Sequence, residues 1–253
     1  MERFICENVF VPLRMGPSHK AEMLSQVLFG EKYEVIDKVG HWMKILTVFD
    51  NYTGWIDINH LQHTRDTENS PGHVLNRSLL CYKEDRTRMV LEAGCEIYTA
   101  DLKKKTFRVG KDIYTAGDEF NEHHIVAKES ISDIGLKFMN SPYIWGGRVP
   151  SGIDCSGFTQ LVYKILGKPI PRDSWQQAEI GTEVTFIDEA NAGDLVLFDE
   201  GGKISHVGMI LSRGLVIHAS GRVRIDSIDH QGIFKAEING YSHHLRTIRR
   251  INP

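Results

Sequence analysis

Residues 153–158 read IDCSGF, in which an acid, a cysteine and a hydroxyl stand in a row. Downstream of Cys155 the apolar residues recur at helical spacing, at Phe158, Leu161, Val162, Ile165 and Leu166. This spacing places them on one stripe of an amphipathic helix, which Gly167 ends and Pro169 keeps from resuming. The stretch therefore predicts a helix with Cys155 in its first turn.

The first turn of a helix can change the chemistry of a cysteine. Its unpaired N–H groups and the helix dipole stabilise a thiolate, and a lowered thiol pKa makes a cysteine a nucleophile. We therefore expect a lowered pKa for Cys155. The alternative is an inert, buried first-turn cysteine, and a base close to the thiol would decide between them.

The composition is that of a soluble globular protein. The chain has 253 residues, 41% of them apolar and 25% charged, which allows one large domain or several small ones. A formal net charge of -3 argues against a nucleic-acid-binding protein. We find no apolar run of about eighteen residues and no signal peptide in MERFICENVFVPLR, so we expect no membrane span and a cytoplasmic protein.

The four cysteines match no zinc-binding pattern. In a reducing cytoplasm we expect Cys6, Cys81 and Cys95 to be buried as small apolar residues. A Cys81–Cys95 disulfide is the alternative. Cys155 is thus the one cysteine for which the sequence predicts a chemical role.

The chain divides into unlike parts. Residues 1–62 contain strand-like pieces with regular turns, typical of a small barrel, and residues 63–73 (HTRDTENSPGH) indicate a linker. A second set of short strands extends to residue 126. Helical periodicity begins only at about residue 127, and strands return from residue 194. These patterns predict an α+β domain over 127–253 preceded by two small all-β domains, 1–62 and 63–126.

Two histidines could supply the base. Residues 194–198 (DLVLF), 204–211 (ISHVGMIL) and 215–220 (LVIHAS) read as consecutive antiparallel strands. A hairpin centred on Arg213 pairs His218 with Gly208, so that His206 and His218 become diagonal neighbours on one face. One can take the thiol proton while the other fixes its tautomer. The pairs at 123–124 and 243–244 show no such relation, and we expect them to be solvated.

Six motifs occur in order, PYIWGG (142–147), GIDCSGF (152–158), PRDSWQQ (171–177), AGDLVLF (192–198), ISHVGMIL (204–211) and VIHASG (216–221). Together they resemble an NlpC-type cell-wall cysteine peptidase domain, which is papain-like in architecture. The resemblance implies that Cys155 is the nucleophile, His206 the general base and His218 the residue that orients it. It also implies that Tyr143 offers its hydroxyl to the oxyanion beside the backbone N–H of Cys155.

The segment 1–62 resembles a bacterial SH3-like domain through Leu13, Arg14, Pro17, Ser18, Gly30, Glu31, Trp42, Gly54, Trp55 and Ile56. Residues 63–126 are similar to a weaker copy. Such domains bind peptides or wall material, but Trp42 and Trp55 can equally be barrel core. The domain order resembles muropeptide-recycling endopeptidases that cut between γ-D-Glu and a diamino acid.

In those enzymes an acid before the nucleophile and polar residues of the first SH3-like domain hold the free amine of the peptide. Asp154 matches that acid, although it can also be the N-cap of the helix. Residues that match the substrate pocket or the closing domain are Trp145, Ser156, Ser174, Tyr52 and, less securely, Glu22. A carboxylate pair with a phenol suits an ammonium in a partly desolvated pocket, whereas a solvated charge is the alternative for Glu22.

We therefore expect a cysteine endopeptidase that releases L-Ala-γ-D-Glu from murein stem peptides with a free N-terminal L-Ala. Thiolate chemistry implies no metal or organic cofactor, and the expected partner is the stem peptide. Three alternatives stay open: a hydrolase of polymeric peptidoglycan, a non-catalytic wall-binding protein, and an amidase or acyltransferase on the same scaffold.

Overall fold

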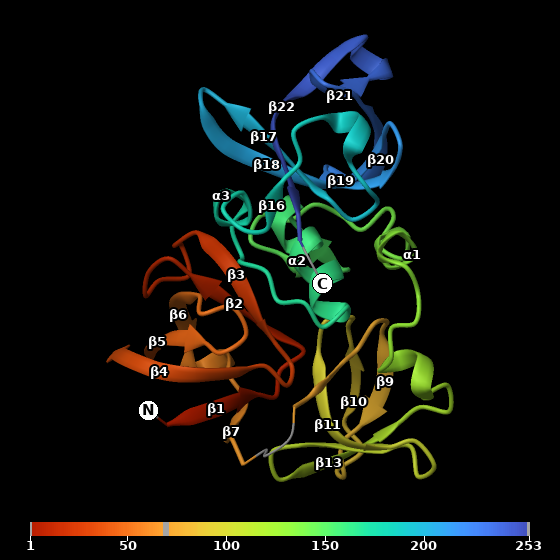
Figure 1. Ribbon diagram of the computed structural model, residues 1–253. Helices are drawn as coiled ribbons and strands as arrows, with labels where there is room; N and C mark the ends of the chain where they lie inside the picture. The colour runs from red at the N-terminus through yellow and green to blue at the C-terminus, as the bar shows by residue number, and fades with distance from the viewer. Residues whose placement is uncertain (1, 68–70, 252–253) are drawn as a thin grey trace. The chain divides into compact units, whose positions relative to one another are not determined.

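The computed structural model describes residues 2–67 and 71–251. The chain forms two compact units, Met1–Lys128 and Glu129–Pro253 (Figure 1). The division falls close to the expected start of the α+β domain at residue 127. Among the described residues, no helix has the length and apolar content needed to cross a membrane.

The first sheet of the N-terminal unit has seven antiparallel strands in the order β3-β2-β6-β5-β4-β1-β7. They are β1 Arg3–Cys6, β2 Phe10–Arg14, β3 Met23–Leu28, β4 Lys32–Val39, β5 Trp42–Thr47, β6 Thr53–Asp57 and β7 His63–Arg65, with the short helix η1 Ile58–His60 before β7. Its core contains Cys6, Val11, Leu13, Val27, Tyr33, Met43, Ile45 and Ile56. Trp42 is buried, which confirms the interpretation of this residue as barrel core, and Trp55 is half-buried.

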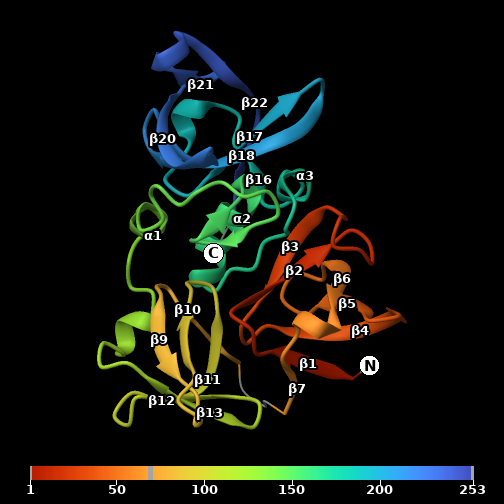
Figure 2. The same ribbon diagram turned by 180° about the vertical axis from the view of Figure 1, so that it is seen from behind.

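The second sheet has six strands in the order β10-β9-β13-β12-β11-β8 and is distinct from the first in Figure 2. The strands are β8 His73–Val74, β9 Leu79–Tyr82, β10 Arg88–Leu91, β11 Glu96–Asp101, β12 Thr106–Val109 and β13 Asp112–Ala116. The expected linker 63–73 begins with β7, which pairs with β1, and ends with β8, which pairs with β11. Its residues 68–70 lie outside the described residues.

Two expectations about buried side chains have clear outcomes in this unit. Cys6, Cys81 and Cys95 are fully buried free thiols, so the expectation of small apolar residues is confirmed and the Cys81–Cys95 bridge is not formed. The expectation of a solvated pair at 123–124 is wrong for His124. That residue closes the short helix η2 Glu122–His124 and packs edge-on against Phe120, with ring centroids 5.8 Å apart.

The two sheets of this unit meet at Gly30. Its φ is +81°, and a Cβ built there would lie 1.9 Å from the carbonyl oxygen of Glu96. The same contact carries hydrogen bonds from the Glu96 N–H to the Phe29 carbonyl (2.8 Å) and from the Tyr98 hydroxyl to the Gly30 carbonyl (2.9 Å). Only a residue without a side chain fits this close approach of two backbones.

We expect Gly30→Ala to destabilise the protein more than Gly40→Ala. Gly40 also has a positive φ, +58°, but a Cβ there would meet nothing within 4 Å. Gly40→Ala should therefore cost about 1–2 kcal/mol of left-handed strain alone, whereas Gly30→Ala should cost about 1–3 kcal/mol more because backbones must separate. Urea unfolding of both variants measures the difference, and equal losses would show that the contact between the sheets is not tight.

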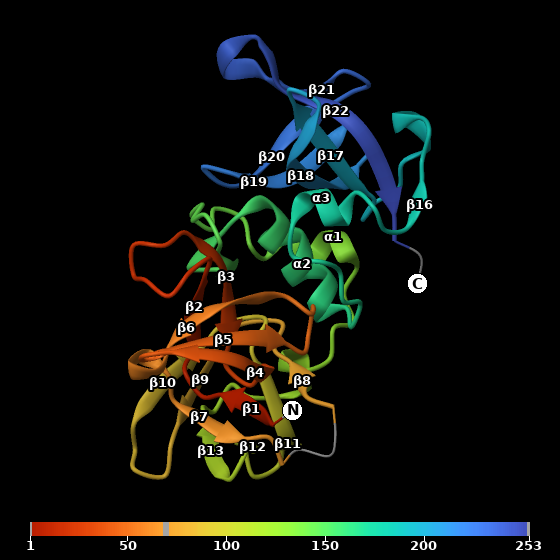
Figure 3. The same cartoon turned by 90° about the vertical axis from the view of Figure 1, so that its left-hand side faces the viewer.

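The C-terminal unit places three helices on one side of a sheet (Figure 3). The helices are α1 Ile131–Leu136, α2 Cys155–Ile165 and α3 Ser174–Gln177, with a small pair β14 Arg148–Val149 and β15 Gly152–Ile153. The sheet contains β16 Thr182–Glu183, β17 Leu195–Glu200, β18 Lys203–Ser212, β19 Leu215–Ser220, β20 Arg222–Ile228, β21 Gly232–Lys235 and β22 Gly240–Arg250, with short helices η3 Ile187–Glu189 and η4 Ala236–Ile238 between strands. Its order is β16-β22-β17-β18-β19-β20-β21, and β21 also pairs with β22, so the sheet closes on itself.

The predicted helix and hairpin of this unit are confirmed. Helix α2 starts at Cys155, ends at Ile165 and packs against β18 and β19. Strands β17, β18 and β19 are consecutive and antiparallel, and Gly208 pairs with His218 as the hairpin register requires. The turn is tighter than expected because Ser212 pairs with Leu215, and a bulge after Ile210 absorbs the difference.

Candidate active site

A chain of hydrogen bonds crosses three neighbouring strands. The Nε2 atom of His206 on β18 lies 2.8 Å from Nδ1 of His218 on β19, and Nε2 of His218 lies 2.9 Å from Oδ2 of Asp226 on β20. Arg224 donates to the other oxygen of Asp226 at 2.6 Å. Both histidines are buried. The chain therefore links a charged pair, Arg224 and Asp226, to His206.

The hydrogen bonds fix the tautomers of both rings. An ionised carboxylate only accepts, so Nε2 of His218 donates to Asp226 and its Nδ1 must accept. Nε2 of His206 is then the donor, which leaves Nδ1 of His206 as the atom with an available lone pair. His206 therefore presents a base at a defined nitrogen.

The surroundings keep both rings neutral. Burial, followed by the neighbouring His218 and His243, holds the pKa of His206 well below its ordinary value. Burial also lowers the pKa of His218, although the hydrogen bond and charge of Asp226 oppose this. For Asp226 burial acts to raise the pKa, but the bonds from His218 and Arg224 outweigh it and the net direction is down. The carboxylate is thus ionised while the imidazoles stay unprotonated at neutral pH.

Cys155 opens helix α2 beside the strand of His206. The backbone N–H of Val207, the residue after His206, is a hydrogen-bonding neighbour of the thiol sulfur. Burial raises the pKa of Cys155 to about 12, the charge of Asp154 adds to the rise, and the Val207 amide and Arg172 oppose it. The expectation of a lowered pKa is therefore wrong, because desolvation outweighs the helix N-terminus. Burial thus favours the neutral form of the Cys155 thiol as well as that of the His206 imidazole.

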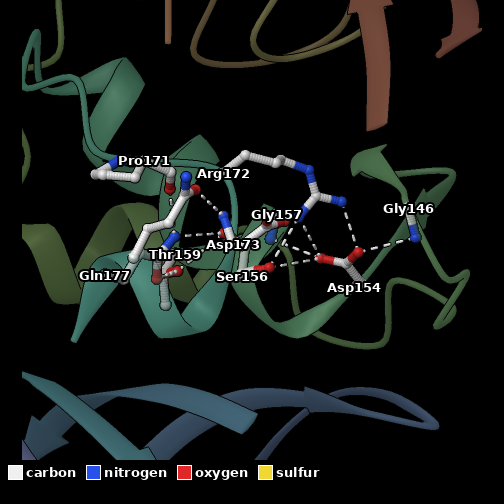
Figure 4. A network of polar contacts seen from close by, with 10 residues as sticks. Gly146, Asp154, Ser156, Gly157, Thr159, Pro171, Arg172, Asp173 and Gln177 are labelled. Atoms are coloured by element: carbon white, nitrogen blue, oxygen red, sulfur yellow. Dashed lines mark hydrogen bonds and ion pairs between the residues drawn. The ribbon is translucent and has the colours of Figure 1, made fainter. Parts of the chain in front are cut away.

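Asp154 is the N-cap of α2 and the centre of a buried polar network (Figure 4). Its carboxylate accepts from the backbone N–H groups of Gly157 (2.7 Å) and Gly146 (2.8 Å). The guanidinium of Arg172 binds both of its oxygens, at 2.6 and 3.1 Å, and also donates to the Ser156 hydroxyl at 2.8 Å. The N-cap interpretation of Asp154 is confirmed, and its charge is balanced by an arginine that is itself buried.

The same network fixes α3 to α2. Thr159 donates to the side-chain oxygen of Gln177 at 2.7 Å, and Gln177 donates to the carbonyls of Ser156 and Pro171. Ser174 is the first residue of α3 and is half-buried. The predicted pocket residues Ser156 and Ser174 are thus held on two helices that are bonded to each other.

Two aromatic residues complete the predicted set in this unit. Tyr143 is half-buried, and its pKa is raised by burial and then by the charges of Cys155 and Asp154, which places its hydroxyl in the electrostatic field of the cysteine. Trp145 is 58% exposed and can therefore be covered by a ligand. Tyr143 and Trp145 both lie on the segment before β14.

Tyr52 and Glu22 belong to the N-terminal unit. Tyr52 is half-buried against the core of the first sheet, with its backbone N–H bonded to the Thr47 hydroxyl at 2.9 Å. Glu22 is exposed at the end of the loop between β2 and β3. Their predicted role in binding an amine stays a prediction.

The sequence did not point to three residues around this site. Asp226 and Arg172 hold the two polar networks, and the ring of His243 stacks on His206 with centroids 4.2 Å apart. Burial lowers the pKa of His243 to about 4, so the expectation of a solvated residue is wrong there, whereas His244 is exposed as expected. Arg172 could have been found from its place in PRDSWQQ. Asp226 and His243 required the register of β20 and β22.

A pocket adjoins His206 on the side of β22. Its lining consists of Asp199, Glu200, Gly201, Ser205, His206, Ser242, His243 and His244. The base is therefore reachable from a hollow with polar and acidic walls. Taken together, the geometry provides a thiol, a neutral base of fixed tautomer and donors near the cysteine, which is what acyl transfer through a thioester needs.

Both units of the chain match known protein families. The profile of the NlpC/P60 family matches residues 140–241, and that of the bacterial dipeptidyl-peptidase SH3 domain matches residues 13–61. A gamma-D-glutamyl-L-lysine dipeptidyl-peptidase of Bacillus subtilis (strain 168) is 27% identical over 225 residues, covering 81% of this chain and 75% of that protein. A protein of the same name from Bacillus cereus (strain ATCC 10987 / NRS 248) is 30% identical over 222 residues, covering 77% of this chain and 66% of that one.

The fold agrees with a solved structure over almost the whole chain. The crystal structure of an NlpC/P60 family protein from Bacillus cereus ATCC 10987 superposes with a TM-score of 0.82 at 22% identity, covering 99% of this chain and all of that one. This likeness is one of fold.

We expect alkylation to distinguish Cys155 from the other cysteines and to report a neutral resting pair. Cys155 is 6% exposed, whereas Cys6, Cys81 and Cys95 are fully buried, so iodoacetamide should modify Cys155 first. Because burial raises the pKa of its thiol, the rate should still rise above pH 9. Peptide mapping at several pH values measures the alkylation rate of Cys155. The variant Cys155→Ala is the control, because it is inactive and cannot be labelled at this position. A plateau from pH 7 upward would indicate a thiolate–imidazolium pair instead.

We expect the histidines and Asp226 to differ in the size of their effects on kcat/KM. His206→Ala removes the base and should lose on the order of 10⁴-fold, whereas His218→Asn and Asp226→Asn only loosen the tautomer and should lose about 100-fold. Asp188→Asn, at an exposed carboxylate, is the control. Near-normal activity of His206→Ala would reverse the roles of base and orienting residue assigned to His206 and His218. Near-normal activity of Asp226→Asn would show that the carboxylate does not orient the histidines.

Proposed function

Since this chain belongs to the NlpC/P60 family and is a cysteine peptidase, we propose that it cuts the γ-D-Glu–diamino acid bond of murein stem peptides. The observation that carries the proposal is the hydrogen-bonded chain from Asp226 through His218 to His206, together with the backbone N–H of the next residue, Val207, at the thiol of Cys155. The substrate class is supported by the relatives named gamma-D-glutamyl-L-lysine dipeptidyl-peptidase. In this proposal the helix α2 and its sheet correspond to the papain-like arrangement.

The first half-reaction forms a thioester. As the sulfur of Cys155 attacks the γ-carbonyl of D-Glu, Nδ1 of His206 takes the thiol proton, so charge develops only in the transition state. The oxyanion is stabilised by the backbone N–H of Cys155 and the hydroxyl of Tyr143. Collapse of the tetrahedral intermediate breaks the C–N bond, and the protonated His206 returns the proton to the leaving amine of the diamino acid.

The second half-reaction releases L-Ala-γ-D-Glu. His206 takes a proton from a water molecule as the water attacks the thioester carbonyl, and it then protonates the leaving sulfur of Cys155. In both halves the imidazolium of His206 is formed beside His218, whose opposite nitrogen is bonded to Asp226. The carboxylate stabilises that transient positive charge without becoming protonated.

The free amine of L-Ala is the second element of the proposal. Arg172 already balances the charge of Asp154, so an ammonium in the same pocket needs a further carboxylate. The proposal assigns Asp154 and Glu22 as the acids that hold the amine, with the hydroxyl of Tyr52 as an acceptor and Trp145, Ser156 and Ser174 as residues of the substrate pocket. Because such amines exist on released stem peptides, the proposal also assigns the enzyme to muropeptide recycling in the cytoplasm.

Acetylation of the substrate amine tests this assignment. The tripeptide L-Ala-γ-D-Glu-diaminopimelate should be cleaved, whereas its N-acetyl form leaves a carboxylate without a cation and should lose about 100- to 1,000-fold in kcat/KM. Glu22→Gln and Tyr52→Phe should raise KM for the free peptide by less, with Cys155 alkylation unchanged. Tyr52→Phe keeps the apolar contacts of the ring with the core, and Glu84→Gln is the control at an exposed acid.

Equal kcat/KM for the free and acetylated peptides, measured by mass spectrometry of the products, would contradict the amine pocket. Release of peptides from intact sacculi at a comparable rate would favour a hydrolase of polymeric peptidoglycan. Binding of sacculi without cleavage of either peptide would favour a non-catalytic wall-binding protein.

A further inference from the structure

Three potential ligand side chains converge on the first sheet, in a part of the chain that the proposed reaction does not use. His19 lies in the loop between β2 and β3, His41 in the turn between β4 and β5, and Asp57 at the end of β6. One ligand atom from each lies within 4.8 Å of the other two. The three segments are distant in sequence, so the sheet topology brings them together.

The carboxylate of Asp57 is buried and oriented. Its Oδ1 accepts from the backbone N–H of Asn59 at 2.9 Å and so caps η1. Its Oδ2 lies 3.0 Å from Nε2 of His19 and 4.0 Å from Nε2 of His41. One oxygen is thus used by the backbone, and the other faces two imidazole nitrogens.

Packing also holds the two imidazole rings. The His19 and His41 rings lie against the buried Trp42, with centroid separations of 5.0 and 5.8 Å. The carbonyl of His41 accepts from the N–H of Ile58, which ties the turn to the segment after Asp57. Since both histidine side chains are about half exposed, with 54% and 55% of their area accessible, an ion can reach them from solvent.

We propose that His19, His41 and Asp57 form a binding site for a divalent transition-metal ion, with zinc as the best match. Two imidazoles and one carboxylate suit zinc, whereas calcium and magnesium prefer oxygen ligands alone. Ligand atoms about 2.0–2.1 Å from a tetrahedral zinc lie about 3.3 Å apart, between the two separations from Asp57 Oδ2. Water fills the fourth position.

Such an ion would clamp the loop between β2 and β3 to the turn between β4 and β5. It would bind the folded first sheet and not the unfolded chain, and therefore raise the unfolding temperature. A simple ion pair between His19 and Asp57 is the competing explanation, and it gives no role to His41. The zinc site does not depend on the proposed peptidase function.

The test uses the full chain with Cys155→Ala, which removes a thiol that could itself bind zinc beside imidazoles. Zinc is titrated in competition with a chromogenic chelator, and unfolding temperatures are measured with and without zinc. We expect one zinc ion per chain at this site and a higher unfolding temperature. His19→Ala, His41→Ala and Asp57→Asn should each weaken binding at least 10-fold, and asparagine retains the cap of η1.

His123→Ala is the matched control, because His123 is an exposed histidine of the same unit and should not alter zinc affinity. Circular dichroism without zinc establishes that each variant folds. Unchanged zinc affinity in the His19→Ala/His41→Ala double variant would overturn the proposal, as would the absence of any zinc-dependent rise in unfolding temperature. A loss of zinc affinity on His19→Ala but none on His41→Ala would show that His41 is not a ligand and would equally overturn the three-ligand site.

Discussion

The buried pair of Asp154 and Arg172 is the interaction on which the geometry of the C-terminal unit depends. One carboxylate caps α2, holds the backbone at Gly146 and neutralises a guanidinium that also reaches Ser156. Burying two charges away from water costs free energy unless their hydrogen bonds are satisfied. Here the Asp154 carboxylate accepts hydrogen bonds from three segments of the chain. The position of Cys155 follows directly, because it is the next residue in the chain after the cap.

The same burial decides how the cysteine and histidine are activated. A helix N-terminus favours a thiolate, but Cys155 and His206 are both removed from water, and each is therefore held in its neutral form. The Cys155 thiolate and the His206 imidazolium are then formed only during the reaction. This arrangement suits the position of Asp226, which is bonded to His218 and not to His206. The carboxylate therefore stabilises a positive charge on His206 through the His218 ring.

Local patterns in the sequence predicted α2, the hairpin and the contact of His206 with His218, because helical periodicity and strand pairing depend on neighbours in the chain. Arg172, Asp226 and His243 were not predicted. His243 reaches His206 from the distant strand β22, and Asp226 reaches His218 through the register of β20. Arg172 stands in the motif PRDSWQQ, but its burial against Asp154 comes from tertiary packing. The pKa of Cys155 was predicted with the wrong sign for a related reason. The helix dipole can be inferred from the sequence, but the burial that outweighs it arises only from packing against β18.

The relay of His206, His218 and Asp226 also limits how the gene for such a protein can change in length. These residues occupy three consecutive strands, joined by a two-residue turn after Ser212 and by Gly221 alone between β19 and β20. Side chains alternate between faces, so inserting or deleting one codon within a strand would turn every later side chain of that strand to the opposite face. A change of two residues keeps the face but shifts the later side chains by about 6–7 Å along the strand, which also breaks the contacts. Only changes absorbed by a bulge, such as that after Ile210, preserve them. Insertions in this region should therefore be tolerated only where a bulge can take up the added residues.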